Sequence, residues 1–283
     1  MMQLDWRKSV QQPSFWFVAL AGGLALLHLT LLDKSKLENL FSLSFLMWLT
    51  VASLLWDKRD RLVLESNLFS TCLGSTLLMF VLLRNLHSSD TSLRILPLVG
   101  GIGILLIASG TKHLKDYYRE MIILSMLVVA RLVAVFLQSI NLSLWTAKFS
   151  AFALWVAGFQ VYRQGVFIEL PLGRVEVYGA CSGVESILLM FCVAILFLFL
   201  IPINHLHKLI CIIVAVSIGF IINALRVSLL AFLVNANNTE AFDYWHGSDG
   251  SLLFAVISVC LFGVYCWFAH VQRFNVPPAS GEN

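Results

Sequence analysis

Nine apolar runs divide this chain of 283 residues, and they constrain its fold more than any other feature. The runs cover residues 15–32, 40–56, 68–83, 95–110, 121–137, 144–159, 186–203, 209–234 and 252–268. A membrane-crossing helix needs about 20 apolar residues, and tilt or flanking residues can complete a shorter run. With 59% apolar and only 12% charged residues, the chain has too little charge for a soluble protein. We therefore predict an all-α polytopic membrane bundle of eight or nine transmembrane helices.

The segments between the runs are too short to hold a soluble domain, the longest being residues 160–183. We expect one membrane-embedded domain over residues 1–283, with N-terminal helices in 1–160, a catalytic core in 161–250, and a last helix and polar tail in 251–283. The first run follows Arg7 and Lys8 but ends without a small-residue cleavage site. It is therefore interpreted as an uncleaved span.

Basic residues between the runs predict the orientation of the chain. Alternate loops on one side carry eight of them: Arg7, Lys8, Lys58, Arg59, Arg61, Lys112, Lys115 and Arg119. The intervening loops carry four: Lys34, Lys36, Arg84 and Arg94. Because cytoplasmic loops are enriched in Lys and Arg, the N-terminus is expected in the cytoplasm. Six crossings would then leave residue 181 on the cytoplasmic side, whereas failure of one early run to cross would move it outside.

Cys181 differs from the other five cysteines, which lie within apolar runs as small core residues. It stands in Ala180-Cys181-Ser182-Gly183, just before the run 186–203. A thiol at a helix N-terminus experiences the positive end of the helix dipole, which favours the thiolate. Ser182 and Gly183 leave room for a second backbone to approach. Cys181 is thus a candidate nucleophile, with a packing role as the alternative.

The segment before Cys181 has the pattern of a small hairpin. Residues 166–170 and 174–178 resemble two short strands around the turn Pro171-Leu172-Gly173, and the second strand alternates polar and apolar residues. We expect this hairpin to lie on the membrane surface. Its edge is suited to binding an extended peptide by strand addition.

Arg226 and His246 are candidate partners of Cys181. Arg226 lies within the run 209–234, where a charge is costly and marks a functional candidate, while His246 precedes the last run. Two crossings return the chain to its starting face, so all three residues are expected on one side. A thiolate can attack a carbonyl, histidine can carry the proton, and arginine can supply donors to an oxyanion or a carboxylate.

Each of these residues has a structural alternative. Arg226 can instead pair with Asp243, Glu185 or a lipid phosphate, and His246 can be an interfacial side chain. Two further basic residues lie within runs: Arg131, for which we expect pairing inside the bundle, and Lys148, which can extend to the interface.

Four motifs together resemble those of the exosortase/archaeosortase family. They are Glu169-Leu170-Pro171-x-Gly173, Ala180-Cys181-Ser182-Gly183, Asn223-x-x-Arg226 and the later His246. The resemblance implies a polytopic membrane transpeptidase. Its protein substrates would carry a C-terminal sorting signal made of a short motif (PEP-CTERM in many bacteria), one transmembrane helix and a basic tail. It implies cleavage through a cysteine thioester at the outer face of the plasma (inner) membrane.

The resemblance also assigns roles to residues of this chain. The catalytic cysteine, arginine and histidine proposed for the family correspond to Cys181, Arg226 and His246. Ser182, Gly183, Glu185 and Asn223 are the candidates for substrate-binding or supporting roles. Glu185 departs from the pattern, because many members have a basic residue there; it is one helical turn from Cys181, where it can orient His246 or pair with Arg226. We predict a cyanobacterial-type subfamily.

A transporter or a non-catalytic assembly factor is the competing interpretation. Transporters also contain buried arginines and glycine-interrupted spans such as Gly100-Gly101-Ile102-Gly103. The transporter interpretation does not explain, however, why a cysteine lies opposite an arginine and a histidine. His205-x-His207 is too small a set for a metal site. We expect no cofactor, no metal and, with a net charge of +3, no nucleic-acid partner. The expected partners are the sorting-signal proteins and the lipid bilayer, with the oligomeric state left open.

Overall fold

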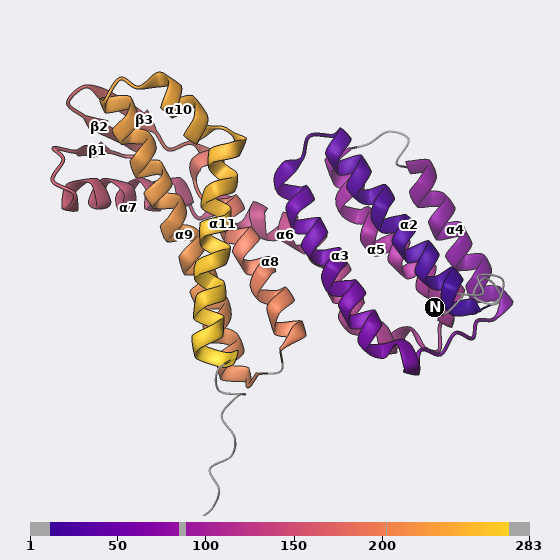
Figure 1. Ribbon diagram of the computed structural model, residues 1–283. Coiled ribbons are helices and arrows are strands. Elements are labelled where there is room, and N and C mark those ends of the chain that lie inside the picture. Colours follow the sequence, from indigo (N-terminus) through magenta and orange to yellow (C-terminus); the bar gives the residue numbers. More distant parts are fainter. Residues whose placement is uncertain (1–11, 85–88, 202, 272–283) are drawn as a thin grey trace, which may run out of the picture. The chain divides into compact units, whose positions relative to one another are not determined.

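The computed structural model describes residues 12–84, 89–201 and 203–271, and every apolar run forms a helix (Figure 1). The helices are α2 (Pro13–Lys34), α3 (Glu38–Lys58), α4 (Leu68–Arg84), α5 (Asp90–Ser109), α6 (Tyr118–Ser139), α7 (Leu142–Val156), α8 (Val184–Leu200), α9 (His205–Asn235), α10 (Thr239–His246) and α11 (Ser248–Cys266). Within these ranges, seven helices are long and apolar enough to cross a membrane, and α4 and α7 are shorter apolar helices. The predicted polytopic helical bundle is confirmed.

The described chain divides into two compact units, of which the first ends at Val129 and the second begins at Ala130. The prediction of one membrane-embedded domain stays a prediction. In the first unit, α2 packs against α3 and α5, and α4 packs against α5. Gly74 and Gly103 allow α4 and α5 to touch, because a Cβ added at Gly74 would lie 2.5 Å from the Gly103 carbonyl oxygen.

The second unit contains the packed helices α8, α9 and α11 together with α7, α10 and a small sheet. The sheet consists of β1 (Tyr162–Gln164), β2 (Phe167–Leu170) and β3 (Gly173–Glu176), antiparallel in the order β1-β2-β3. Strands β2 and β3 are the predicted hairpin. The sequence did not predict β1, which has only three residues, and Gly165, at a φ of 61°, helps to turn the chain from β1 into β2.

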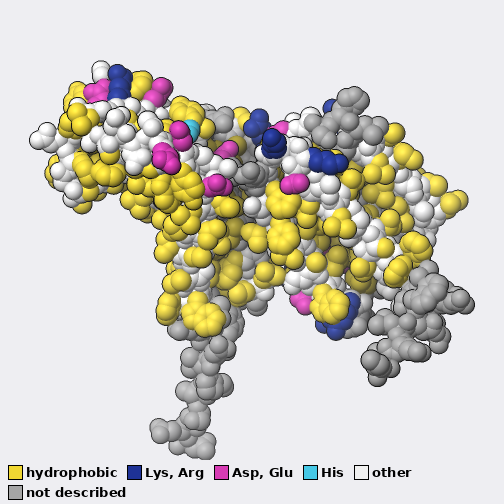
Figure 2. All heavy atoms as spheres, turned by 45° about the horizontal axis from the view of Figure 1, so that its top comes forward, with side chains coloured by type: hydrophobic (Ala, Val, Ile, Leu, Met, Phe, Trp, Pro, Cys, Tyr) yellow, Lys and Arg dark blue, Asp and Glu magenta, His cyan; other side chains and the backbone are white. Residues whose placement is uncertain are grey.

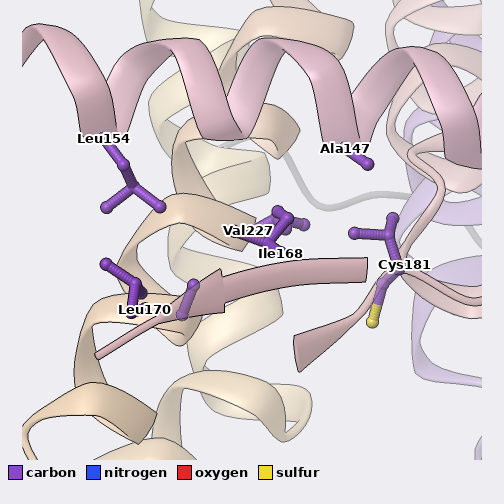
Figure 3. Packing of buried hydrophobic residues seen from close by; sticks show 8 residues of the cluster. Ala147, Leu154, Ile168, Leu170, Cys181 and Val227 are labelled. Atoms are coloured by element: carbon purple, nitrogen blue, oxygen red, sulfur yellow. The ribbon is translucent and has the colours of Figure 1, made fainter. Parts of the chain in front are cut away.

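One cluster of buried residues joins the sheet to α7 and α9 and reaches the motif before α8 (Figure 3). Its members are Ala147, Leu154, Ile168, Leu170, Val177, Cys181, Val227 and Ala231. The β2–β3 turn is also attached to the end of α9, because the Leu172 amide donates a hydrogen bond to Asn235 Oδ1 at 2.9 Å. This packing places the segment that leads into Cys181 against two helices.

Helix α7 differs from its neighbours in both length and direction. It has 15 residues, and Figure 1 shows it running crosswise to α9 and α11 in the same unit. The apolar run 144–159 is longer than the helix, since the chain turns at Gly158, which has a φ of 89°. The run therefore ends in a turn before the helix reaches the length of a full crossing.

Candidate active site

Cys181 lies in a tight turn that requires glycine at position 183. Cys181 ends the 3-10 turn Gly179–Cys181, and α8 begins three residues later at Val184. Gly183 has a φ of 89°, and a Cβ added there would lie 2.8 Å from Asn223 Nδ2. Glycine is therefore required both for the left-handed backbone and for the close approach of α9.

Side chains from two helices hold the backbone of this turn. Asn223 Nδ2 of α9 donates a hydrogen bond to the Cys181 carbonyl oxygen at 3.1 Å, and Thr146 Oγ1 of α7 donates one to the Ser182 carbonyl oxygen at 2.7 Å. The Ser182 hydroxyl donates to the Gly179 carbonyl oxygen at 2.6 Å. Asn223 and Ser182 are both buried and bonded to backbone, so the geometry gives them supporting positions.

Cys181 itself is 8% exposed, and its sulfur points away from α7 (Figure 3). The Sγ atom lies 3.9 Å from His246 Nε2. The structure therefore brings together two side chains that are 65 residues apart in the chain. Glu185 is exposed in the first turn of α8.

His246 is the last residue of α10, and two other side chains contact its ring. The imidazole stacks on Phe242 one turn earlier, with centroids 5.3 Å apart and planes at 9°. Its Nε2 atom also lies 3.1 Å from the Tyr178 hydroxyl. The end of α10 touches the start of α11 closely, because a Cβ added at Gly250 would lie 2.5 Å from the Trp245 Cα atom. These contacts fix the ring beside the thiol.

Arg226 reaches the same region from α9 and binds the backbone of α10. Its Nε donates to the Trp245 carbonyl oxygen at 3.3 Å, and its Nη2 donates to the His246 carbonyl oxygen at 2.9 Å. The last carbonyl groups of a helix lack partners within the helix and form the negative end of its dipole. The guanidinium therefore stabilises the C-terminal end of α10 and, with it, the position of His246.

Tyr178 is a site residue that the sequence did not single out. Its hydroxyl contacts His246 Nε2, and the neighbouring Cys181, as the largest cause, raises the pKa of Tyr178 above its usual value, with burial acting in the same direction. The side chain is 47% exposed at the edge of the site. In the sequence, Tyr178 could have been identified only as a tyrosine three residues before Cys181. That spacing points to the site only when the 3-10 turn between them is known.

The model of the transmembrane exosortases (Exosortase_EpsH) matches residues 36–263 of this chain. The chain belongs to the exosortase family. The match confirms the resemblance and includes the whole region from the sheet to His246. No curated protein and no solved structure matches the chain.

Membership makes this exosortase a multi-pass membrane protein and, in general terms, a sorting transpeptidase that acts on sorting-signal proteins. Among its described residues, no group of three or more His, Cys, Asp or Glu side chains could hold a metal ion. The catalytic roles of Cys181, His246 and Arg226 stay predictions.

Proposed function

We propose that this exosortase is a cysteine transpeptidase that cleaves the C-terminal sorting signal of exported proteins through a thioester on Cys181. The observation that carries the proposal is the 3.9 Å approach of Cys181 Sγ to His246 Nε2 in a chain of this family. Nucleophile–base distances in substrate-free sites are often long and shorten when substrate binds.

The reaction follows from these two groups. His246 takes the thiol proton, and Sγ attacks the carbonyl carbon of the scissile peptide bond. The tetrahedral intermediate collapses to the thioester as His246 returns the proton to the leaving amine. An acceptor (water, an amine or a lipid headgroup) then attacks the thioester, losing its proton to His246, which returns that proton to the departing Cys181 sulfur.

Arg226 and Tyr178 position the imidazole for both steps. Arg226 holds the backbone at His246, and the Tyr178 hydroxyl shares Nε2 with the thiol. We assign Tyr178 to orienting the ring before substrate arrives. Both residues thereby restrict His246 to the geometry that proton transfer requires.

The sheet supplies a route for the substrate. Strand β3 is an edge strand and ends at Glu176, five residues before Cys181. An extended peptide that pairs with this edge would lead its scissile bond towards the thiol. We place the enzyme in the plasma (inner) membrane, with this site facing outward.

Replacement of Cys181 tests the proposed function. Cys181→Ala should leave the protein level and membrane insertion normal, while a sorting-signal substrate accumulates uncleaved. Cys192→Ala is the matched control, because Cys192 is a buried cysteine of α8, 1% exposed, and stands eleven residues after Cys181 in the chain. The wild-type protein should also accumulate a substrate adduct that hydroxylamine releases. Continued processing by Cys181→Ala would rule out the cysteine mechanism.

A further inference from the structure

Helix α7 presents an exposed aromatic face that the chemistry at Cys181 does not use. The residues of this face are Trp145, Phe149, Phe152, Trp155 and Val156, which are 46–65% exposed. Their spacing of three and four residues places them on one side of the helix. Thr146, Ala147, Ser150 and Leu154 form the opposite side and are buried.

The buried side of α7 packs against the sheet, which is the polar part of the unit. Its residues Ala147 and Leu154 pack in one cluster with Ile168 and Leu170 of β2. The sheet exposes charged side chains such as Arg174 and Glu176, which belong in water. Figure 2 shows charged side chains gathered at the sheet end of this unit and hydrophobic ones over the helices below. Helix α7 thus lies between a water-exposed sheet and an apolar surface.

The length and direction of α7 exclude an ordinary crossing. Fifteen residues make a helix about 22 Å long, whereas the hydrocarbon core is about 30 Å thick. Figure 1 shows α7 crosswise to α9 and α11, which both have the length and composition of spans. A helix crosswise to two spanning helices runs along the membrane plane.

We propose that α7 lies in the lipid–water interface and binds phospholipid with its aromatic face. Tryptophan is enriched at this depth, and Trp145 and Trp155 stand towards the two ends of the helix. Lys148, the cation on the same side, holds its Nζ 4.4 Å from the centre of the Trp145 ring, where it can also reach lipid phosphate. Helices that lie in the interface typically contact the acyl chains with apolar side chains and the lipid phosphates with cationic ones.

The aromatic face also continues the lipid-exposed surface of a spanning helix. Phe149 makes an edge-to-face contact with Phe220 of α9, with ring centroids 5.1 Å apart. Ile221 and Leu225 of α9 are 48% and 46% exposed on a helix that has the composition of a span. Lipid that covers α9 therefore reaches α7 without a break.

A helix that stays in the interface changes the side on which Cys181 lies. The end of α6 and the start of α8 are then on the same side of the membrane. Helix α4 is shorter than the other spans of the first unit but packs along α5, and with α4 counted as a crossing, α2 to α6 make five crossings. An N-terminus in the cytoplasm, as the basic residues predict, then places Cys181 outside. The charge bias and an outward-facing site agree once α7 does not cross.

Depth measurements along α7 test the placement independently of the chemistry at Cys181. Single cysteines replace Trp145, Phe149, Phe152 and Val156 in a Cys72→Ser, Cys181→Ala, Cys260→Ser background, which removes the two exposed native thiols and the site thiol. Each purified variant carries a fluorophore and is reconstituted in vesicles that contain lipids with nitroxide quenchers at known depths. We expect the four depths to agree within about 5 Å, one helical turn, near the headgroups.

Helix α6 provides the matched control, because Ile122 and Val129 are exposed residues of a span. Labels at these two positions should differ in depth by about 10 Å. A gradient of about 16 Å from residue 145 to residue 156 would show that α7 crosses, and would overturn the proposal. Absence of lipid quenching at all four α7 sites, with normal quenching on α6, would show that lipid does not reach this face and would overturn the proposal equally.

Labelling on both sides of α7 gives a second, separate result. Cysteines introduced at Ile140 and Ala157, exposed residues on either side of the helix, should react with a membrane-impermeant maleimide from the same side of the membrane. Reaction from opposite sides would refute the interfacial placement whatever the activity of the enzyme. An inactive Cys181→Ala background does not affect either measurement, so failure here is distinct from failure of the proposed function.

Discussion

The two hydrogen bonds from Arg226 to α10 allow the effect of Arg226→Lys to be worked out. Nε and Nη2 bind two successive carbonyl oxygens, those of Trp245 and His246, at 3.3 and 2.9 Å. A hydrogen bond from a charged donor contributes about 1.5–3 kcal/mol. Lysine keeps the charge at the end of α10 but offers a compact ammonium in place of the planar fork, so we expect it to replace one bond and lose the other.

If this loss falls on the placement of His246, cleavage should slow by about 10- to 150-fold, since 1.36 kcal/mol corresponds to a factor of ten. The assay is cleavage of a sorting-signal substrate in membranes, normalised to the amount of inserted enzyme. Hydrogen exchange of the α10 amides should increase in the same variant, because the helix end loses a contact. Arg131→Lys on α6 is the matched control, and both readouts should remain at the wild-type level there.

Three results would refute this reasoning about Arg226. Near-normal cleavage in Arg226→Lys would show that charge alone is sufficient. Loss of the variant protein from the membrane would show that Arg226 stabilises the fold and does not act in cleavage. Cleavage reduced by more than about 10³-fold with unchanged α10 exchange would instead indicate donors aimed directly at the oxyanion, the role first predicted from the sequence.

The remaining predictions concern the turn and the ring beside the thiol. Gly183→Ala forces a left-handed φ on alanine and pushes against Asn223, so we expect about 1–3 kcal/mol of strain, seen as a lower unfolding temperature, whereas Gly179→Ala, which meets open space, should have little effect. Tyr178→Phe should slow cleavage by about 2- to 10-fold, because one neutral hydrogen bond contributes about 0.5–1.5 kcal/mol. The raised pKa of Tyr178 keeps the hydroxyl protonated through neutral and mildly alkaline pH, so this ratio should stay constant there; a ratio that falls to one below about pH 9 would contradict the assignment. His246→Gln should remove most activity, and substantial cleavage by that variant would exclude its role as proton carrier.

Much of the fold and part of the site follow from the sequence by itself. Apolar runs of helical length in a chain poor in charge determine a polytopic helical bundle, because the bilayer requires every backbone polar group to be bonded within a segment. The hairpin before Cys181 follows from alternation around Pro171-Leu172-Gly173, which is also local. Counting crossings between Cys181 and His246 was sufficient to place them on one side, because each crossing helix puts the residues that follow it on one of only two sides of the membrane.

Tertiary structure alone decided the contacts that run between segments. The third strand β1 is too short to carry a pattern and exists through pairing with β2. Tyr178 becomes a site residue only because α10, which comes later in the chain, brings His246 against it. The direction of α7 is decided in the same way, since its apolar run has the composition of a span but its buried side packs on the sheet and α9. Hydrophobicity identifies which residues avoid water, whereas the packing of distant segments decides whether they meet lipid along the membrane or across it.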